Sequence, residues 1–482
     1  MNRRAARSAS FLTPFAVAFS LAGCANFSPD GGMGPVQTSA RLDLNANAEK
    51  IVSDEQAINV ETRYRNLLKK GLTVDRAVQI ALLNNKGLQA AYNELGISEA
   101  QYIQASLPPN PGISFSRSSG SGELDIERQI AASLLALLTL PARRDIAETQ
   151  FKAAQFKAID ATLRLAADAR RQFWRAVAAS EQSGYLVQAR TAAQTASELA
   201  TRLGETGGLN KLDQSREHAF YAELAAQTSK ARVQQTLERE RLTRLMGLWG
   251  RDIAYVLPSR LPALPGKLKP AVPIEMEAIE RRVDLKLARG ELDLVAKQLG
   301  LTQATRYINA LDLSGSSTYS RKVTVDSGSG AVDIEKARMR GGGLALEIPI
   351  FDFGEARTRE AEETYMHAAN RLAEKAVNVR SEAREAYAAY KGAWDVARVY
   401  QGQVLPLRKS IQDEVLLHYN GMLADLFQVI QDARLRVISN MAAIDARRDF
   451  WIASTDLQAA IIGGGMAGGE SKSISAAAGG GE

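Results

Sequence analysis

Residues 123–140 read ELDIERQIAASLLALLTL, and this stretch decides the fold. Apolar residues fall on every second position from Leu124 to Leu140, with Arg128 as the exception. The opposite face begins with acidic and amide side chains, at Asp125, Glu127 and Gln129. A period of two is typical of a strand with one apolar face. About ten such residues suffice for a strand of a membrane barrel, so the stretch predicts one. A soluble hairpin or a buried helix is the alternative.

The same pattern occurs elsewhere in the chain. Ile113 and Phe115 alternate with serines before the serine- and glycine-rich residues 118–122, a composition that favours a turn. In the second half, Leu311 and Leu313 begin an alternation, and a loop at 327–330 follows. The last apolar face runs through Leu344, Leu346, Ile348 and Ile350. We therefore expect two hairpins, within residues 111–140 and 309–350.

Four strands cannot close a barrel by themselves. An open sheet edge in lipid leaves backbone N–H and C=O groups without partners. If the strands cross a membrane, the chain must therefore form oligomers. Three copies would supply twelve strands, an even number within the range known for membrane barrels.

Long proline-free segments flank the predicted strands. No proline lies between residues 142 and 257, and only Pro406 follows residue 350. These segments are rich in Ala, Glu, Arg, Gln and Leu, which are good helix formers. A helix over 142–203 would be about 90 Å long, much longer than globular domains use. Narrow apolar stripes with many small and charged residues favour the wall of a water-filled tube, and a soluble coiled coil is the alternative.

The two halves of the chain repeat each other. Six residues between positions 81 and 101 recur as the same residue types 197 positions later. Four more recur 214 positions apart: Gly207, Leu209, Leu212 and Gln214 match Gly421, Leu423, Leu426 and Gln428. We expect two helix–hairpin–long helix repeats, at 71–257 and 274–462, joined by a proline-rich linker at 258–273.

The N-terminus resembles a targeting segment. Residues 1–23 combine three arginines with an apolar run that is shorter than the roughly 20 residues of a membrane helix, which predicts a signal peptide. The sequence LAGC at 21–24 resembles a bacterial lipobox, and Cys24 is the only cysteine. We expect lipid attachment at Cys24, with a free thiol as the alternative. Residues 24–70 are expected to be an extended lipidated segment, and the Gly/Ala-rich residues 463–482 a disordered tail.

Several functions are not supported by the sequence. Removing residues 1–23 lowers the net charge from +6 to +3, so the basic pI does not indicate nucleic-acid binding. The histidines His218, His367 and His418 are far apart and lack metal-ligand spacing. The chain has no phosphate-binding GxxxxGK[ST] motif and no GxSxG nucleophile elbow. We expect no enzyme activity, no metal and no cofactor.

Three short segments carry a family resemblance. They read LPPNPGI at 107–113, PIFDFG at 349–354 before Arg357, and YNGML at 419–423. With the duplication and the lipobox, they resemble the TolC-like outer membrane efflux proteins, in the lipoprotein subgroup. The resemblance implies a mainly helical trimer, in which long antiparallel helices form an α-barrel tube capped by a twelve-stranded β-barrel with four strands from each protomer.

The resemblance also implies a function. The chain would be a passive outer membrane duct of a tripartite efflux or export system, anchored by lipid and extending into the periplasm. Its partners would be a periplasmic adaptor protein and an inner-membrane pump that supplies the energy. A periplasm-facing structural lipoprotein with a helical coiled-coil body and no channel is the alternative. The sequence does not identify the cargo.

The resemblance places functional residues at two helical turns. The candidates for contact with the adaptor are Arg202, Leu203, Gly207, Gly208 and Leu209 in the first turn, and Tyr419, Asn420, Gly421, Met422 and Leu423 in the second. For Gly207 and Gly421, simple formation of the turn is the alternative role.

The family also carries a carboxylate gate in its lumen. Asp432, in the segment QDAR, best fits that gate, with Asp425 as the second candidate. The family's usual paired Asp is not reproduced, because Val429 stands three residues before Asp432. An exposed Asp on a helix face is the alternative for both positions.

Overall fold

The computed structural model describes residues 27–268, 274–325 and 332–465, which fold into two compact units. Unit 1 holds residues up to 32, 95–154 and 290–370, and unit 2 holds 33–94, 155–289 and the chain from 371 onward. Each of the two sequence repeats contributes segments to both units. The long helices of the repeats pass from one unit into the other.

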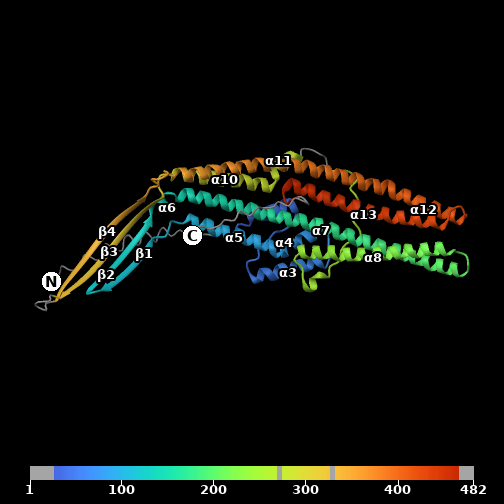
Figure 1. Cartoon of the computed structure of the whole chain (residues 1–482), viewed down its shortest axis with the longest axis horizontal. Coiled ribbons are helices and arrows are strands. Elements are labelled where there is room, and N and C mark those ends of the chain that lie inside the picture. The colour runs from blue at the N-terminus through green and yellow to red at the C-terminus, as the bar shows by residue number, and fades with distance from the viewer. Residues whose placement is uncertain (1–26, 269–273, 326–331, 466–482) are drawn as a thin grey trace. The chain divides into compact units, whose positions relative to one another are not determined.

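The first half of the chain begins with three short helices (Figure 1). These are α2 (Gly34–Leu44), α3 (Asp54–Leu68) and α4 (Val74–Asn84). The first repeat then continues with α5 (Lys86–Ser106), β1 (Gly112–Gly120), β2 (Glu123–Ser133), α6 (Leu134–Leu138), α7 (Leu140–Glu205) and α8 (Lys211–Leu245). A 3-10 turn, η1 (Gly250–Ile253), follows it.

Within the described residues, the second repeat has a similar order of elements, except that it lacks a counterpart of α6 and its first long helix contains a π-helical turn. It runs through α9 (Ile274–Arg281), α10 (Val283–Ala304), β3 (Ala310–Val325), β4 (Val332–Glu347) and α11 (Glu355–Val399). A π-helical turn, η2 (Tyr400–Val404), leads directly into α12 (Leu405–Asn420), and α13 (Leu426–Ile462) closes the repeat. The predicted mainly helical fold with two hairpins is confirmed.

Residues 24–70 are not the extended segment that the sequence suggested. Where the structure describes them, they contain α2 and α3. Pro35 stands in the first turn of α2, where its missing N–H costs nothing. The Ser53 side chain accepts a hydrogen bond from the Gln56 N–H and caps α3. Both start signals can be read in the sequence, at Pro35 and Ser53.

The strands end earlier than the alternation predicted. β2 ends at Ser133, and residues 134–138 form α6 instead of continuing the strand to Leu140. The segment LLALL is apolar at almost every position, so it satisfies a helical period as well as a period of two. Ser133 decides between them, because its hydroxyl accepts a hydrogen bond from the Ala136 N–H, 3.5 Å away. β4 likewise ends at Glu347, before Ile348 and Ile350.

The four strands form one antiparallel sheet in unit 1, in the order β1-β2-β3-β4 (Figure 1). The pairing of β2 with β3 joins the two repeats, with Ile126 opposite Tyr319. The outer pairs place Phe115 opposite Arg128 and Leu313 opposite Leu344. The two predicted hairpins are thus side by side in a single sheet.

The helix segments of unit 1 pack against one another. Tyr102 of α5 stacks on Phe151 of α7, with ring centroids 5.9 Å apart. The Lys297 ammonium of α10 donates to the Thr149 hydroxyl of α7 at 2.8 Å. Aromatic stacking and polar contacts therefore join α5, α7 and α10 in this unit.

Unit 2 has a core of small and aromatic side chains. One hydrophobic cluster joins α11 and α13 through Ala386, Tyr390, Ala397, Ala446, Phe450, Ala453, Leu457 and Ala460. Trp174 of α7 stacks on Trp451 of α13 at 5.1 Å. Buried alanines let the helix backbones approach closely, as expected for long helices packed along narrow seams.

None of the helices in the described ranges combines the length and the apolar character needed to cross a membrane.

Candidate functional site

The sheet has two faces that differ in chemistry. Directly paired residues of antiparallel strands point to the same side, so the register assigns every strand residue to a face. The face that includes Phe115, here called the Phe115 face, carries the apolar residues Ile113, Leu124, Ile126, Ile130, Leu311, Leu313, Leu344 and Leu346. The opposite face, here called the Ser116 face, carries serine, threonine, glycine and carboxylate side chains. One face suits lipid and the other suits water.

The sheet also has two free edges. In the described sheet, β1 pairs only with β2 and β4 pairs only with β3. The whole length of β4 is exposed. An exposed edge strand can pair with a strand of another chain. Both edges of the described sheet are therefore available for pairing.

The segment 349–354 connects β4 to α11. Gly354 has φ +71°, and a Cβ there would lie 2.3 Å from the carbonyl oxygen of Arg306. The Gly354 N–H donates to the Asp352 carboxylate at 3.0 Å, and the Arg306 side chain donates to the Phe353 carbonyl oxygen at 3.0 Å. This turn therefore requires glycine at its last position.

The first helical turn joins α7 to α8. Its backbone closes with the N–H groups of Gly208 and Leu209, which both donate to the Leu203 carbonyl oxygen, at 2.8 and 3.2 Å. Gly207 has φ +72°, so it adopts the left-handed conformation that favours glycine. Asn210 then caps α8 by accepting a hydrogen bond from the Asp213 N–H at 2.8 Å.

The second turn joins α12 to α13 at the same end of unit 2 as the first (Figure 1). The Leu423 N–H donates to the His418 carbonyl oxygen at 2.8 Å. Here the left-handed residue is Met422, with φ +59°, and not Gly421. The side chains of Met422 and Leu423 are 94% and 77% exposed. Two large apolar side chains thus stand in solvent at a turn whose backbone is well hydrogen-bonded.

The two helix pairs, α7–α8 and α12–α13, contact each other behind these turns. Arg434 of α13 pairs with Glu223 of α8 at 3.0 Å. The Arg216 guanidinium lies over the Phe427 ring, 4.7 Å from its centroid. The candidate adaptor residues of both turns therefore belong to one end of unit 2 and not to separate surfaces.

The structure brings Asp425 and Asp432 into different surroundings. Asp425 caps α13, because its carboxylate accepts a hydrogen bond from the Gln428 N–H at 2.9 Å. Asp432 is buried, with its carboxylate 3.9 Å from Arg408 of α12. Its other oxygen, Oδ2, has no hydrogen-bond partner among the described residues. In the single chain Asp432 is therefore not an exposed helix residue, whereas Asp425 is exposed at the start of its helix.

A buried group of charges lies between α10 and α11 in unit 2. Arg282 donates two hydrogen bonds to the Asp284 carboxylate, at 3.0 and 2.8 Å, and also pairs with Glu382. Lys375 lies 3.5 Å from Asp284. Burial raises the pKa of the Asp284 carboxyl, but the hydrogen bonds and charge of Arg282, together with Lys375, outweigh burial and hold the pKa below its ordinary value.

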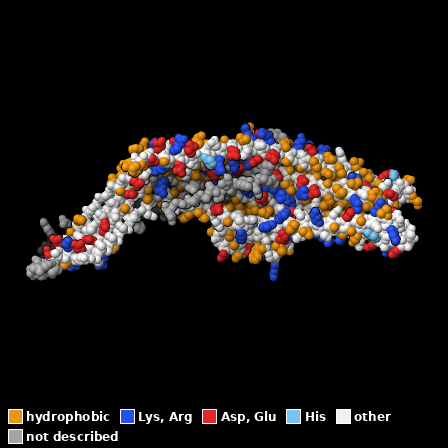
Figure 2. Space-filling view, viewed as in Figure 1, with side chains coloured by type: hydrophobic (Ala, Val, Ile, Leu, Met, Phe, Trp, Pro, Cys, Tyr) orange, Lys and Arg blue, Asp and Glu red, His pale blue; other side chains and the backbone are white. Residues whose placement is uncertain are grey.

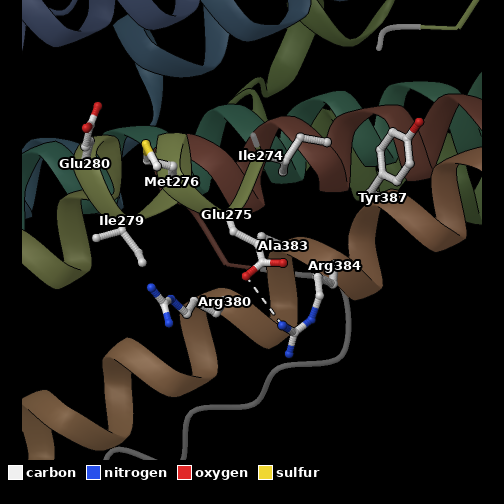
Figure 3. A pocket seen from close by; sticks show the side chains of 9 residues that line it. All are labelled: Ile274, Glu275, Met276, Ile279, Glu280, Arg380, Ala383, Arg384 and Tyr387. Carbon is white, nitrogen blue, oxygen red and sulfur yellow. Dashed lines mark hydrogen bonds and ion pairs between the residues drawn. The ribbon is translucent and has the colours of Figure 1, made fainter. Parts of the chain in front are cut away.

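A shallow pocket lies between α9 and α11 (Figure 3). Its lining is formed by Ile274, Glu275, Met276, Ile279, Glu280, Arg380, Ala383, Arg384 and Tyr387. Glu275 and Arg384 point toward each other across it and pair at 3.4 Å. None of these nine lining residues is a histidine, cysteine, serine or lysine, so the pocket lacks a nucleophile activated by a base.

Two further predictions concern metal and lipid. Among the described residues, no group of three or more His, Cys, Asp or Glu side chains could hold a metal ion. Cys24, the predicted lipid attachment site, lies outside the described residues, as do residues 1–23 and most of 463–482.

Comparisons with known proteins agree with this geometry. The family model of outer membrane efflux proteins matches residues 276–415. No curated protein matches the chain. The match lies within the second repeat, where the chain is similar to the outer membrane efflux proteins. This similarity agrees with the predicted channel class.

Solved structures share the fold of this chain. Crystal structures of CusC, described in terms of folding and transmembrane channel formation, match with a TM-score of 0.67 at 18% identity, over 81% of this chain and 92% of that chain. The CmeC outer membrane channel of Campylobacter jejuni matches with 0.67 at 16% identity, over 87% and 90%. The outer membrane protein VceC of Vibrio cholerae matches with 0.66 at 16% identity, over 84% and 98%.

Proposed function

We propose that this chain is an outer membrane efflux protein, the passive duct of a tripartite efflux or export system, and that it works as a homotrimer. Three four-stranded sheets would close into a twelve-stranded barrel by pairing β1 of one protomer with β4 of the next. The observation that carries the proposal is the sheet itself, which has one apolar face, one polar face and two free edges. In lipid, free edges must be paired.

The two faces fix the orientation of the sheet in this barrel. The Phe115 face would meet lipid, because its apolar rows include Ile113, Ile130 and Leu313. The Ser116 face would line the lumen, where small hydroxyl side chains and carboxylates face water. An aqueous lumen of this kind carries cargo without chemistry, so the energy for export must come from the inner-membrane pump.

The helical end of unit 2 would dock to the periplasmic adaptor. Leu203, Met422 and Leu423 are exposed at the two turns, and both turns lie at one end of the unit. Their backbones are fixed by caps and turn hydrogen bonds, so they offer a rigid apolar surface. Asp432 and Asp425 behind the second turn would form the lumen gate, where assembly of three copies would bring their carboxylates together.

We further propose that the N-terminus is anchored through an acyl chain on Cys24 after removal of residues 1–23. The short apolar run, the LAGC segment and the single cysteine support this step. The anchor would hold the protein at the outer membrane while the helices extend into the periplasm.

Cysteine labelling of adjacent strand residues tests the duct. Leu313 and Ser314 are neighbours in β3 but lie on opposite faces. In intact outer membranes, a charged thiol reagent that cannot cross lipid should label Ser314→Cys and leave Leu313→Cys largely unlabelled. Cys24 is the only native cysteine, so the original protein, without either substitution, serves as the background control. Equal labelling of both positions would contradict the membrane sheet and would support the helical structural lipoprotein.

A further inference from the structure

The two faces of the sheet carry charges of opposite sign. All charged side chains of the described strand pairs that lie on the Phe115 face are cations, namely Arg117, Arg128, Arg321, Lys336, Arg338 and Arg340. The Ser116 face carries one cation, Lys322, and the carboxylates of Glu123, Asp125, Glu127, Asp312, Asp333, Glu335 and Glu347. Figure 2 shows one side of the sheet, with acidic side chains gathered near its hairpin ends.

Contacts between strands confirm this assignment of the faces. On the Ser116 face, the Lys322 ammonium pairs with the Glu123 carboxylate at 2.7 Å. On the Phe115 face, the Arg338 guanidinium lies 5.7 Å from the centroid of the Tyr319 ring. All six cations of the Phe115 face are exposed, and in the described part of the chain no carboxylate forms an ion pair with any of them.

The six cations form a belt next to an apolar band. Register places them in three consecutive rows across the sheet, with Arg128 in the row of Arg340, Arg117 in the row of Arg338, and Arg321 opposite Lys336. The belt spans about 13 Å along the strands, since each residue rises about 3.3 Å. The rows nearer the helices are apolar and include Ile113, Ile130, Leu313 and Leu344.

A belt of cations on a lipid-facing surface needs anionic partners. A charged side chain facing hydrocarbon is costly, and this cost falls toward the interface. The strand face itself supplies no carboxylate. Five of the six cations are arginines, whose planar guanidinium groups bind phosphate oxygens in bidentate fashion. The adjoining apolar rows provide a surface for acyl chains.

We propose that this belt binds the phosphate groups of a phosphorylated, acylated glycolipid in the outer leaflet, the lipid A part of lipopolysaccharide, with its acyl chains on the apolar rows. This inference rests on the proposed function, because it requires the Phe115 face to meet lipid. The bound lipid neutralises the belt from outside, while the carboxylates of the Ser116 face remain in the aqueous lumen.

Lipid binding to the full-length protein tests the proposal. The protein, purified in mild detergent, is titrated with lipid A and the bound copies are counted by native mass spectrometry. The triple variant Arg128→Gln, Arg338→Gln and Arg340→Gln should bind about a hundredfold more weakly, at about fivefold for each cation near an anionic headgroup. The control variant Lys230→Gln, Arg232→Gln and Lys322→Gln removes equal charge elsewhere and should bind within about threefold of the original protein.

A second arm uses the unaltered protein, so it does not depend on how the variants fold. Lipid A from which the phosphates have been removed should bind about as weakly as lipid A binds to the triple variant. Equal binding of phosphorylated and dephosphorylated lipid, or unchanged binding by the triple variant, would overturn the proposal. A competing excess of inorganic phosphate that abolishes binding at millimolar concentration would also overturn it, because the belt would then be a site for free phosphate.

The same preparation reports on the proposed function. Its mass shows the oligomeric state, and its conductance in a planar bilayer shows a channel. A conducting trimer that binds both lipids equally would overturn only the lipid proposal. A monomer that neither conducts nor binds lipid A would overturn both.

Discussion

Arg282 and Asp284 illustrate how single residues organise the long helices of unit 2. Both side chains are buried and are joined by two hydrogen bonds. The Arg282 guanidinium also pairs with Glu382 of α11, which links the start of α10 to α11. A buried ion pair contributes little compared with a well-packed apolar pair, but removing one partner leaves an uncompensated charge. The pair therefore determines where these helices meet more than how strongly they pack.

Asp284→Asn should lower the free energy of unfolding by about 3 kcal/mol at pH 7. The pKa of Asp284 is lowered in the folded protein, so its ionised form stabilises the fold above the pKa of the unfolded chain, and this contribution is lost as pH falls through the folded pKa. The difference between variant and original protein should thus shrink below about pH 4. Chemical unfolding of both detergent-solubilised proteins at several pH values measures this difference in the free energy of unfolding.

Asp449→Asn is the matched control. Asp449 is exposed and in the described structure pairs only with its half-buried neighbour Arg448, so its replacement should cost less than about 1 kcal/mol. If Asp284→Asn costs no more than this control, or costs the same at acidic pH, the buried pair does not have the role described.

The candidate residues of the turns could be predicted from sequence because glycine, asparagine and aspartate mark local backbone geometry. Gly207 adopts the predicted left-handed conformation. Two features could not be predicted. Met422 takes the left-handed position at the second turn, which glycine had suggested for Gly421. The charge group around Asp284 includes Glu382 and Lys375, which are distant in sequence and have no local signal.

At the scale of elements, helix lengths were predictable and helix irregularities were not. The proline-free segment predicted a helix over 142–203, and α7 runs over Leu140–Glu205. Pro406 lies within the second long helical segment, where proline removes a backbone hydrogen bond. The π-helical turn η2 comes just before Pro406 and leads from α11 into α12. The end of β2 also differs from the prediction. The segment LLALL fits a strand period and a helix period, and the Ser133 cap is what favours the helix.

Gly354→Ala tests the element that connects β4 to α11. The new Cβ would approach the Arg306 carbonyl oxygen to 2.3 Å and would force an unfavourable positive φ. We expect a loss of at least about 2 kcal/mol in the free energy of unfolding. Thermal unfolding of the solubilised variant and original protein measures this loss of stability.

Gly300→Ala provides the comparison for this substitution. Gly300 lies within α10, and a Cβ there would meet no atom within 4 Å. Alanine is the better helix former by about 1 kcal/mol, so this variant should be as stable as the original protein or slightly more stable. Equal effects of both substitutions would show that the Gly354 turn is not strained.

At the scale of the whole molecule, a single chain leaves its sheet incomplete. The described sheet ends in unpaired β1 and β4, and its two faces suit different solvents. The sequence anticipated this point, because four alternating segments predict strands that one chain cannot close. It did not anticipate the separation of charge between the faces, since that depends on the register of all four strands at once.

The number of copies in the assembled protein tests the central claim most directly. Native mass spectrometry of the full-length protein, extracted from outer membranes in mild detergent, should give three copies, each with residues 1–23 removed and acyl chains at Cys24. Pairing of β1 with β4 in neighbouring copies requires such a closed ring. A monomer, even one carrying lipid, would contradict the duct, because four strands with two free edges cannot cross the membrane alone.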